Sequence, residues 1–229
     1  MRGAPFGRVC SADILTLLVP TLLLLIRHAV TDATGKRLIG WEPGVHLSDR
    51  GREQAEALAE RLSPVPIHAL YASPLERCLE TAEPIVGSRR IEVQTAEALG
   101  EVRYGDWTGR PLAQLARTKL WKAVQRSPSS VRFPRGETLL EVQDRAIEET
   151  TRLVAAHPSK VVALVSHGDV IRLLLAHFAG VHVDLFQRLV VHPASVSAIA
   201  AGDGVPRILR MNDTGDLSDL APPKRKARG

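Results

Sequence analysis

Short apolar runs alternate with longer amphipathic segments along most of this chain. Uncharged runs rich in Leu, Val and Ile are typical of buried strands, whereas apolar residues repeated every three or four positions are typical of helices. The strands predicted in this way cover 22–26, 68–73, 91–93, 161–165, 195–201 and 207–211. The predicted helices cover 48–62, 74–83, 111–124, 137–157 and 169–178, and the segments 31–46 and 98–109 are expected to be loops.

Individual side chains set several of these boundaries. The hydroxyl of Ser48 is suited to capping the first helix, and Pro74 is suited to beginning the second. Pro84 disfavours the helical conformation of Glu83, so we expect the second helix to end near Glu83. Strands that alternate with helices predict an α/β protein, a three-layer α/β/α sandwich with a mostly parallel central sheet.

The two ends of the chain differ from the part between them. Residues 14–26 form an uncharged run of 13 residues, but the run is too short to span a bilayer and Pro20 interrupts it. We therefore expect 1–18 to be a loosely attached extension, and we expect no membrane partner. One hypothesis is that Val19 is the true initiator, encoded by a GTG codon. Residues 213–229 combine low hydrophobicity with a Lys/Arg cluster, which predicts a disordered basic tail. The main domain is expected to span 19–212.

Charge and cysteine content narrow the functional classes. The chain carries 30 Lys and Arg against 25 Asp and Glu, a net charge of +5. These cations do not form a stripe interleaved with aromatic residues, so nucleic acid is not an expected partner. A binding site for a small anionic substrate accounts for the mild excess of positive charge equally well. Cys10 and Cys78 are the two cysteines, which excludes a disulfide framework and favours the cytoplasm.

Two histidines each follow an apolar strand. His28 comes after 22–26, with Arg27 beside it, and His167 comes after 161–165 in the sequence Ser166-His167-Gly168. Ligands of α/β sheets bind just beyond the carboxyl ends of the strands. We therefore expect both imidazoles at one edge of the sheet, in one pocket. Histidine and arginine together predict a phosphate site with a reactive histidine.

The residue types around this edge suit phosphoryl transfer. A neutral imidazole can accept a phosphoryl group and release it again, and arginines can hold the phosphate oxygens. Arg77, near the start of the second helix, is a candidate second arginine because helix N-termini favour anions. Glu101, in a Gly-rich loop, is the candidate acid and base. No Asp/His/Cys cluster has metal-like spacing, so we expect neither a metal nor a cofactor.

Taken together and in chain order, these segments resemble the histidine phosphatase superfamily, in the phosphoglycerate mutase-like branch. Arg27-His28-Ala29 is similar to the family's opening Arg-His-Gly motif. Ser73-Pro74-Leu75-Glu76-Arg77 is similar to its Ser-x-x-x-Arg segment. Glu101 lies in a loop that resembles the family's acidic loop, and Ser166-His167-Gly168 resembles its second histidine motif. The resemblance covers about residues 21–210.

The resemblance implies roles for particular residues. It implies that His28 becomes phosphorylated, that Glu101 gives and takes the proton, and that His167 completes the catalytic set. The phosphate is implied to be held by Arg27, Arg77 and His167. Thr34 and Gly168 are implied to line the substrate site, although Thr34 stands where many members have Asn. Ala29 and Ile39 also depart from the family pattern, which usually has Gly and Gln there.

Four functions remain open at this stage. One of them is a protein phosphohistidine phosphatase, although members of that type are usually shorter and lack much of the region that caps the pocket. The leading hypothesis is a metal-independent phosphatase that acts on a small phosphorylated metabolite. The first alternative is a phosphoglycerate mutase-type isomerase, although only 65 residues separate Glu101 from His167 and the glycolytic mutases usually carry a longer insertion there. The second alternative is a catalytically silent phosphate-binding protein. The segment 111–134 is expected to cover the pocket, which favours small substrates. The sequence indicates neither the phosphoester nor the oligomeric state.

Overall fold

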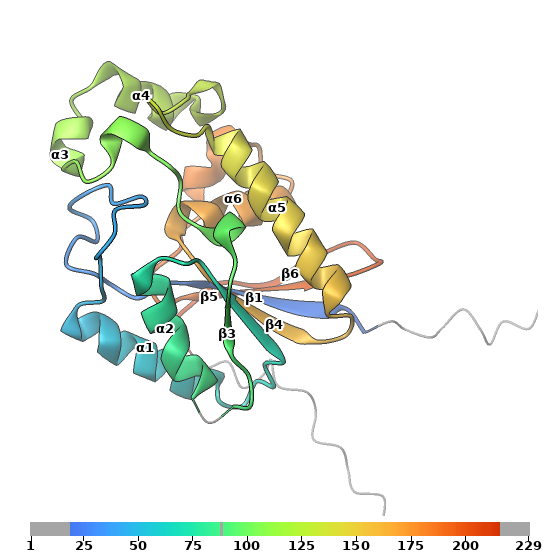
Figure 1. Ribbon diagram of the computed structural model, residues 1–229. Helices are drawn as coiled ribbons and strands as arrows, with labels where there is room; N and C mark the ends of the chain where they lie inside the picture. The colour runs from blue at the N-terminus through green and yellow to red at the C-terminus, as the bar shows by residue number, and fades with distance from the viewer. Residues whose placement is uncertain (1–18, 88, 216–229) are drawn as a thin grey trace, which may run out of the picture.

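The computed structural model describes residues 19–87 and 89–215 and forms an α/β sandwich around one six-stranded sheet (Figure 1). The order of the strands is β3-β2-β4-β1-β5-β6. The pairs β3–β2, β2–β4 and β4–β1 are parallel, whereas β5 is antiparallel to both β1 and β6. The strands are β1 (Thr21–Arg27), β2 (Ala69–Ala72), β3 (Val93–Thr95), β4 (Val161–Ser166), β5 (Val196–Ala201) and β6 (Arg207–Asp213).

Helices cover both faces of this sheet, as the three-layer prediction requires (Figure 1). Helices α1 and α2 lie against one face, and α5 and α6 lie against the other. The helices are α1 (Asp49–Leu62), α2 (Glu76–Val86), α3 (Leu112–Leu115), α4 (Lys119–Arg126), α5 (Leu139–Ala156) and α6 (Gly168–Phe178). Short 3₁₀ turns occupy Glu97–Leu99, Gly105–Trp107, Pro128–Ser130 and Val183–Arg188. The predicted fold class is confirmed.

The position of strand β1 in the sheet explains why its apolar residues do not alternate with polar ones. Leu23 and Leu25 belong to the hydrophobic core shared with α5 and α6, whereas Leu24 and Ile26 belong to the core shared with α1 and α2. All four side chains are at most 1% exposed. Because a central strand of a parallel sheet is covered on both faces, both sets of alternating side chains are apolar.

The structure corrects the predicted end of the second helix. Helix α2 continues through Pro84 to Val86, so the prediction that it ends near Glu83 is wrong. Proline fixes φ near a helical value, but it removes one i→i−4 hydrogen bond and its ring crowds the carbonyl four residues earlier. Pro84 lies two residues before the end of α2, so this disturbance is confined to the last turn. The helix then ends at Gly87, whose N–H donates to the carbonyl of Glu83 over 3.2 Å.

The structure also divides the helix predicted over 111–124. Helices α3 and α4 are separate, and Thr118 lies between them. Its hydroxyl donates to the carbonyl of Leu115 over 2.7 Å and accepts from the N–H of Trp121 over 3.1 Å. One side chain therefore ends α3 and caps α4, in the manner typical of threonine at a helix start.

Other boundaries move by a few residues. The third strand lies at Val93–Thr95 instead of 91–93, and the second helix starts at Glu76, two residues after Pro74. Strand β6 reaches Asp213, one residue into the segment predicted as a tail, and Arg61 pairs with the Asp213 carboxylate over 3.5 Å. The expected extension 1–18 and residues 216–229 of the expected tail lie outside the described residues. None of the helices in the described part of the chain has the length and apolar character of a bilayer-spanning helix.

Truncating a central-strand leucine is expected to destabilise the fold. Leu24 is fully buried, so Leu24→Ala should lower the free energy of unfolding by roughly 2–5 kcal/mol. Leu209→Ala is the matched control, because Leu209 lies on edge strand β6 and is 42% exposed; it should cost less than about 1 kcal/mol. Urea unfolding followed by circular dichroism measures both, and equal losses would contradict the core assignment.

Candidate active site

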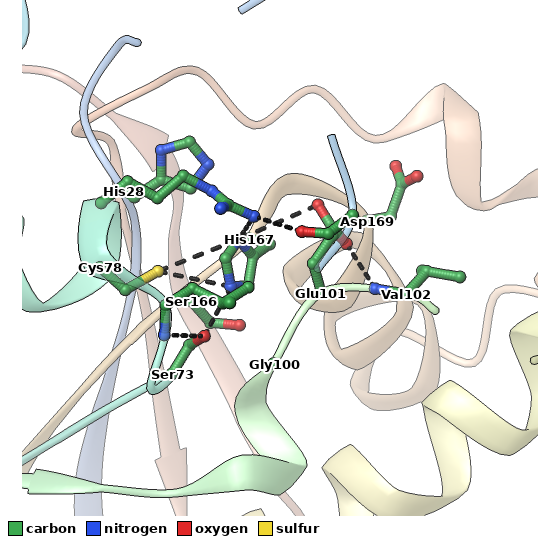
Figure 2. Close-up of polar contacts among 12 residues, drawn as sticks. His28, Ser73, Cys78, Gly100, Glu101, Val102, Ser166, His167 and Asp169 are labelled. Carbon is green, nitrogen blue, oxygen red and sulfur yellow. Dashed lines mark hydrogen bonds and ion pairs between the residues drawn. The ribbon is translucent and has the colours of Figure 1, made fainter. Parts of the chain in front are cut away.

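His28 and His167 meet at the carboxyl edge of the sheet because β1 and β4 are parallel neighbours in register. Arg27 pairs with Ser166, and each histidine follows directly. The N–H of His28 donates to the carbonyl of Ser166 over 2.9 Å. The two imidazole centroids lie 5.2 Å apart in an edge-to-face arrangement, and both residues are buried (Figure 2).

The hydrogen bond of His28 determines which ring nitrogen is free to react. Nδ1 lies 2.7 Å from the carbonyl oxygen of Ala29, and because a carbonyl can only accept, Nδ1 carries the proton. Nε2 therefore holds the lone pair. Burial, followed by the guanidinium groups of Arg77 and Arg27, holds the pKa of His28 well below its ordinary value. The ring is thus neutral at physiological pH and presents a nucleophilic nitrogen.

Two guanidinium groups lie beside this ring, that of Arg77 buried and that of Arg27 partly buried. Arg27 donates to the carbonyl of Val191 over 2.6 Å, and Arg77 donates to the carbonyl of Gly40 over 2.8 Å. Within the described residues, Nε of Arg27 and one terminal nitrogen of Arg77 have no hydrogen-bond partner although both are buried. Unpaired buried cationic donors are costly. This pair of groups therefore suits the oxygens of an anion such as phosphate.

His167 lies behind Arg77. One terminal nitrogen of Arg77 lies 3.2 Å from Nδ1 of His167, and Nε2 of His167 lies 2.7 Å from the hydroxyl of Ser73. Since arginine only donates, Nδ1 accepts and Nε2 carries the proton. Burial, with Arg77 next, holds the pKa of His167 well below its ordinary value. Both ring nitrogens lie within hydrogen-bonding distance of protein groups, and the contact with Arg77 connects His167 to the cavity.

Glu101 reaches the same cavity from a loop whose backbone is held firmly. Arg145, on α5, donates to the carbonyls of Ala98, Gly100 and Glu101 at 2.6–3.0 Å. One carboxylate oxygen of Glu101 accepts from the N–H of Val102, and the other lies 4.0 Å from Nδ1 of His167 (Figure 2). Burial, with the carboxylate of Asp169 next, raises the pKa of Glu101 to about 7. Such a group can both give and take a proton near neutral pH.

The cavity that these residues share has a volume of about 230 Å³ and is lined by both polar and apolar side chains. Its lining includes predicted site residues from four separate segments: Arg27, His28, Thr34, Arg77, Glu101 and Gly168. His167 stands behind this lining. A larger hollow of about 740 Å³ lies near the start of β1. Among the described residues, no histidine, cysteine or glutamate lines this hollow, so the smaller cavity is the candidate site.

Thr34 and Gly168 contribute to the cavity in different ways. The hydroxyl of Thr34 accepts from the N–H of Thr31 over 2.9 Å, so it closes the turn that forms one wall. Gly168 gives Arg27 room: a Cβ at this position would lie 3.2 Å from Nε of Arg27. Gly168 therefore lets the guanidinium pack directly against the start of α6.

The predicted cover over the pocket contributes little to its lining. Of the segment 111–134, Leu112 alone is among the lining residues in the described part of the chain. The rest of the segment packs on an aromatic cluster, in which the rings of Trp107 and Trp121 lie 6.0 Å apart and the ring of Phe133 lies 5.5 Å from that of Trp107. These aromatic contacts therefore hold the segment 111–134 beside the site.

The sequence analysis did not identify Asp169, Tyr104 and Arg172 as site residues, although all three line the cavity. Asp169 accepts from the hydroxyl of Tyr104 over 2.7 Å and from Arg172 over 2.8 Å. An acidic residue in the first turn of a helix is common for purely local reasons, so Asp169 gave no signal of its own. Its position directly after Ser166-His167-Gly168 is the one feature that could have drawn attention to it.

Comparison with known proteins now assigns the family. Residues 23–214 match the family model described as histidine phosphatase superfamily (branch 1). The chain belongs to the histidine phosphatase superfamily. Membership in this superfamily and relatives named as phosphatases identify it as an enzyme, a phosphoric monoester hydrolase.

Curated and solved relatives of this histidine phosphatase cover most of both chains. Phosphoserine phosphatase 1 of Hydrogenobacter thermophilus is 29% identical over 211 residues, covering 90% of this chain and 98% of its own. The solved structure of YhfR from Bacillus stearothermophilus has a TM-score of 0.80 at 31% identity and covers 85% of this chain and 98% of its own. A putative alpha-ribazole-5'-P phosphatase from Escherichia coli has a TM-score of 0.78 at 27% identity, covering 86% and 98% respectively.

Adding one methyl group beside Arg27 is expected to impair this histidine phosphatase. Gly168→Ala should displace the Arg27 guanidinium and lower kcat/KM by about 10-fold or more, because small misplacements of binding groups are costly in catalysis. Gly204→Ala is the matched control, since a Cβ there meets nothing within 4 Å. Phosphate release measures both variants. If the two variants retain equal activity, the close approach of Gly168 and Arg27 has no functional role.

Proposed function

We propose that this protein hydrolyses a small phosphomonoester without a metal ion, through a phosphohistidine intermediate on His28. The observation that carries the proposal is the tautomer of His28: its Nδ1 is bonded to the Ala29 carbonyl, so Nε2 keeps its lone pair beside two arginines. A neutral, fixed nucleophile next to paired cationic donors is the arrangement that phosphoryl transfer requires.

In the first step, Nε2 of His28 attacks phosphorus and the bond from phosphorus to the ester oxygen breaks. Arg27 and Arg77 hold the equatorial oxygens, where negative charge is spread in the transition state. Glu101 gives its proton to the departing alkoxide. The products of this step are the free alcohol, phosphorylated His28 and an ionised Glu101.

In the second step, the ionised Glu101 takes a proton from a water molecule, which attacks phosphorus. The bond between phosphorus and Nε2 breaks, so inorganic phosphate leaves and His28 returns to its neutral form. Because the pKa of Glu101 is raised to about 7, both of its forms are accessible near neutral pH. One carboxyl group therefore serves both steps.

The substrate class we propose is a small phosphorylated metabolite. A cavity of about 230 Å³ has room for a compact phosphoester but not for a large one. The related proteins named above include a phosphoserine phosphatase and a putative alpha-ribazole-5'-P phosphatase, and both names denote small phosphomonoesters. We further propose a cytoplasmic location, which rests on the cysteine content.

The same site also bears on two alternatives to this proposal, an isomerase and a silent binding protein. Relatives named phosphoglycerate mutase-like protein 4 of Arabidopsis thaliana (34% identical over 157 residues) and probable phosphoglycerate mutase keep an isomerase possible. The cations of the cover, including Lys119 and Lys122, do not line the cavity. A second acidic group of a phosphoglycerate would therefore lack these partners, which favours hydrolysis. The convergence of His28, Glu101 and two arginines argues against a silent binding protein.

Removing the nucleophile is the decisive test. Phosphate release from a panel of small phosphoesters, assayed with a metal chelator present, should fall by at least about 10³-fold in His28→Ala. Rapid quenching of the wild type should trap an acid-labile phosphoryl group on His28. Full activity in His28→Ala would overturn the proposal. Interconversion of 3- and 2-phosphoglycerate with little phosphate release, in the presence of 2,3-bisphosphoglycerate, would establish the isomerase instead.

The pH dependence should report Glu101 and not His28. The value of kcat/KM for an alkyl phosphate should be flat below about pH 7 and fall as pH rises through the raised pKa of Glu101, because the first step needs its protonated form. The lowered pKa of His28 keeps the ring neutral, so no loss is expected from it down to about pH 6. Glu101→Gln should slow alkyl phosphates much more than aryl phosphates with good leaving groups. A wild-type profile that rises from pH 6 to pH 8 would contradict this assignment.

A further inference from the structure

A second carboxylate shares the cavity with Glu101. Asp169, in the first turn of α6, lines the same cavity and is three-quarters buried (Figure 2). Each of its oxygens has a partner: Oδ2 accepts from the hydroxyl of Tyr104 over 2.7 Å, and Oδ1 accepts from Arg172 over 2.8 Å. With both oxygens committed, Asp169 is not free to exchange protons with a substrate.

The partners of Asp169 are themselves fixed. Arg172 donates through Nε to the carbonyl of Leu189 over 3.1 Å. Tyr104 is buried and packs edge-to-face on Phe133 with ring centroids 4.9 Å apart. Burial, followed by the charge of Asp169, raises the pKa of Tyr104 well above its ordinary value, so its hydroxyl stays a donor. Asp169 is thus held in one place by its ion pair with Arg172 and by the hydrogen bond from Tyr104.

Charged and titratable groups from several elements surround Glu101. Arg27 of β1 and Arg77 of α2 favour its ionised form, whereas burial and Asp169 of α6 oppose that form. His167 after β4 is neutral, with its Nδ1 4.0 Å from Glu101. Arg145 of α5 bonds to the backbone carbonyl of Glu101. Two cations close to a carboxylate would ordinarily keep it ionised.

We propose that Asp169 is a positioning residue whose fixed negative charge keeps Glu101 protonated, so that Glu101 enters the first step as an acid. This inference rests on the proposed function, because it concerns the proton that Glu101 gives to the leaving oxygen. Tyr104 and Arg172 hold Asp169 at the cavity wall, and Asp169 offsets the two arginines that the phosphate needs. The same pocket can therefore bind a phosphate through cations and still contain a protonated carboxyl group.

The variant Asp169→Asn tests the inference because it removes the charge and keeps the shape of the side chain. For an alkyl phosphate, the alkaline limb of kcat/KM should move to lower pH by about one unit, the shift typical of removing a nearby like charge. At pH 8 the rate should then fall by about 10-fold relative to the wild type. The loss should be several-fold smaller with an aryl phosphate, whose leaving group needs no proton.

The matched control is Tyr104→Phe, which removes one hydrogen bond of Asp169 and leaves its charge in place. The alkaline limb should stay within a few tenths of a pH unit in this variant. If Asp169→Asn does not fold, Asp169→Ser supplies the same charge removal at this partly exposed position. An unmoved limb in the folded variant, or an equal shift in Tyr104→Phe, would overturn the inference.

A direct readout separates this inference from the proposed function. Carbon-13 NMR of labelled glutamate in a His28→Ala background follows the titration of Glu101 without turnover, and Asp169→Asn should lower its midpoint. If Glu101→Gln hydrolyses alkyl phosphates as fast as the wild type, the proposed role of Glu101 fails first. If Glu101→Gln is slow but Asp169→Asn leaves the midpoint unchanged, only the role of Asp169 fails.

Discussion

The parallel register between β1 and β4 is the constraint on which the site depends. It sets Arg27 opposite Ser166, so the two strands end together and their next residues, His28 and His167, meet at one edge. Both strands are buried on both faces, which requires the long apolar runs that precede the histidines. A shift of one residue would turn each side chain to the other face of the sheet and separate the two rings.

Around this edge, the protein balances buried positive and negative charge. Burial, followed by the guanidinium of Arg77, holds the pKa values of both histidines low, which keeps His28 neutral and nucleophilic. Arg77 and Arg27 would ionise Glu101 if burial and Asp169 did not oppose them. Each ionisable group therefore owes its protonation state to its neighbours, and the site works as one electrostatic unit.

Backbone carbonyls give the site its rigidity. The carbonyl of Ala29 fixes the tautomer of His28, and the carbonyls of Gly40 and Val191 hold the two arginines. Arg145 performs the converse role, since its one guanidinium holds three backbone carbonyls in residues 98–101 of the loop that carries Glu101. Preorganised groups of this kind need not move when charge develops in the transition state.

The sequence by itself determined the fold class, the family and the main candidate residues of the cavity. Apolar runs and helical periodicity are local, so the strands that precede His28 and His167 are visible in the order of residues. The order along the chain of the motifs around Arg77 and Glu101 also supports the assignment to the family. The helix boundaries near Pro84 and Thr118 were predicted incorrectly from the sequence. Helix α2 passes through Pro84, and Thr118 divides α3 from α4.

The tertiary structure alone decided which groups touch. Asp169 meets Tyr104 across 65 positions of the chain, and Arg77 meets His167 across 90. Such contacts leave no period or motif in the sequence, because they arise only when distant segments are folded onto one sheet edge. The tautomer of His28, the place of His167 behind Arg77, and the raised pKa of Glu101 all depend on these distant neighbours. Burial and charge act through space, so the sequence could supply the groups but not their protonation states.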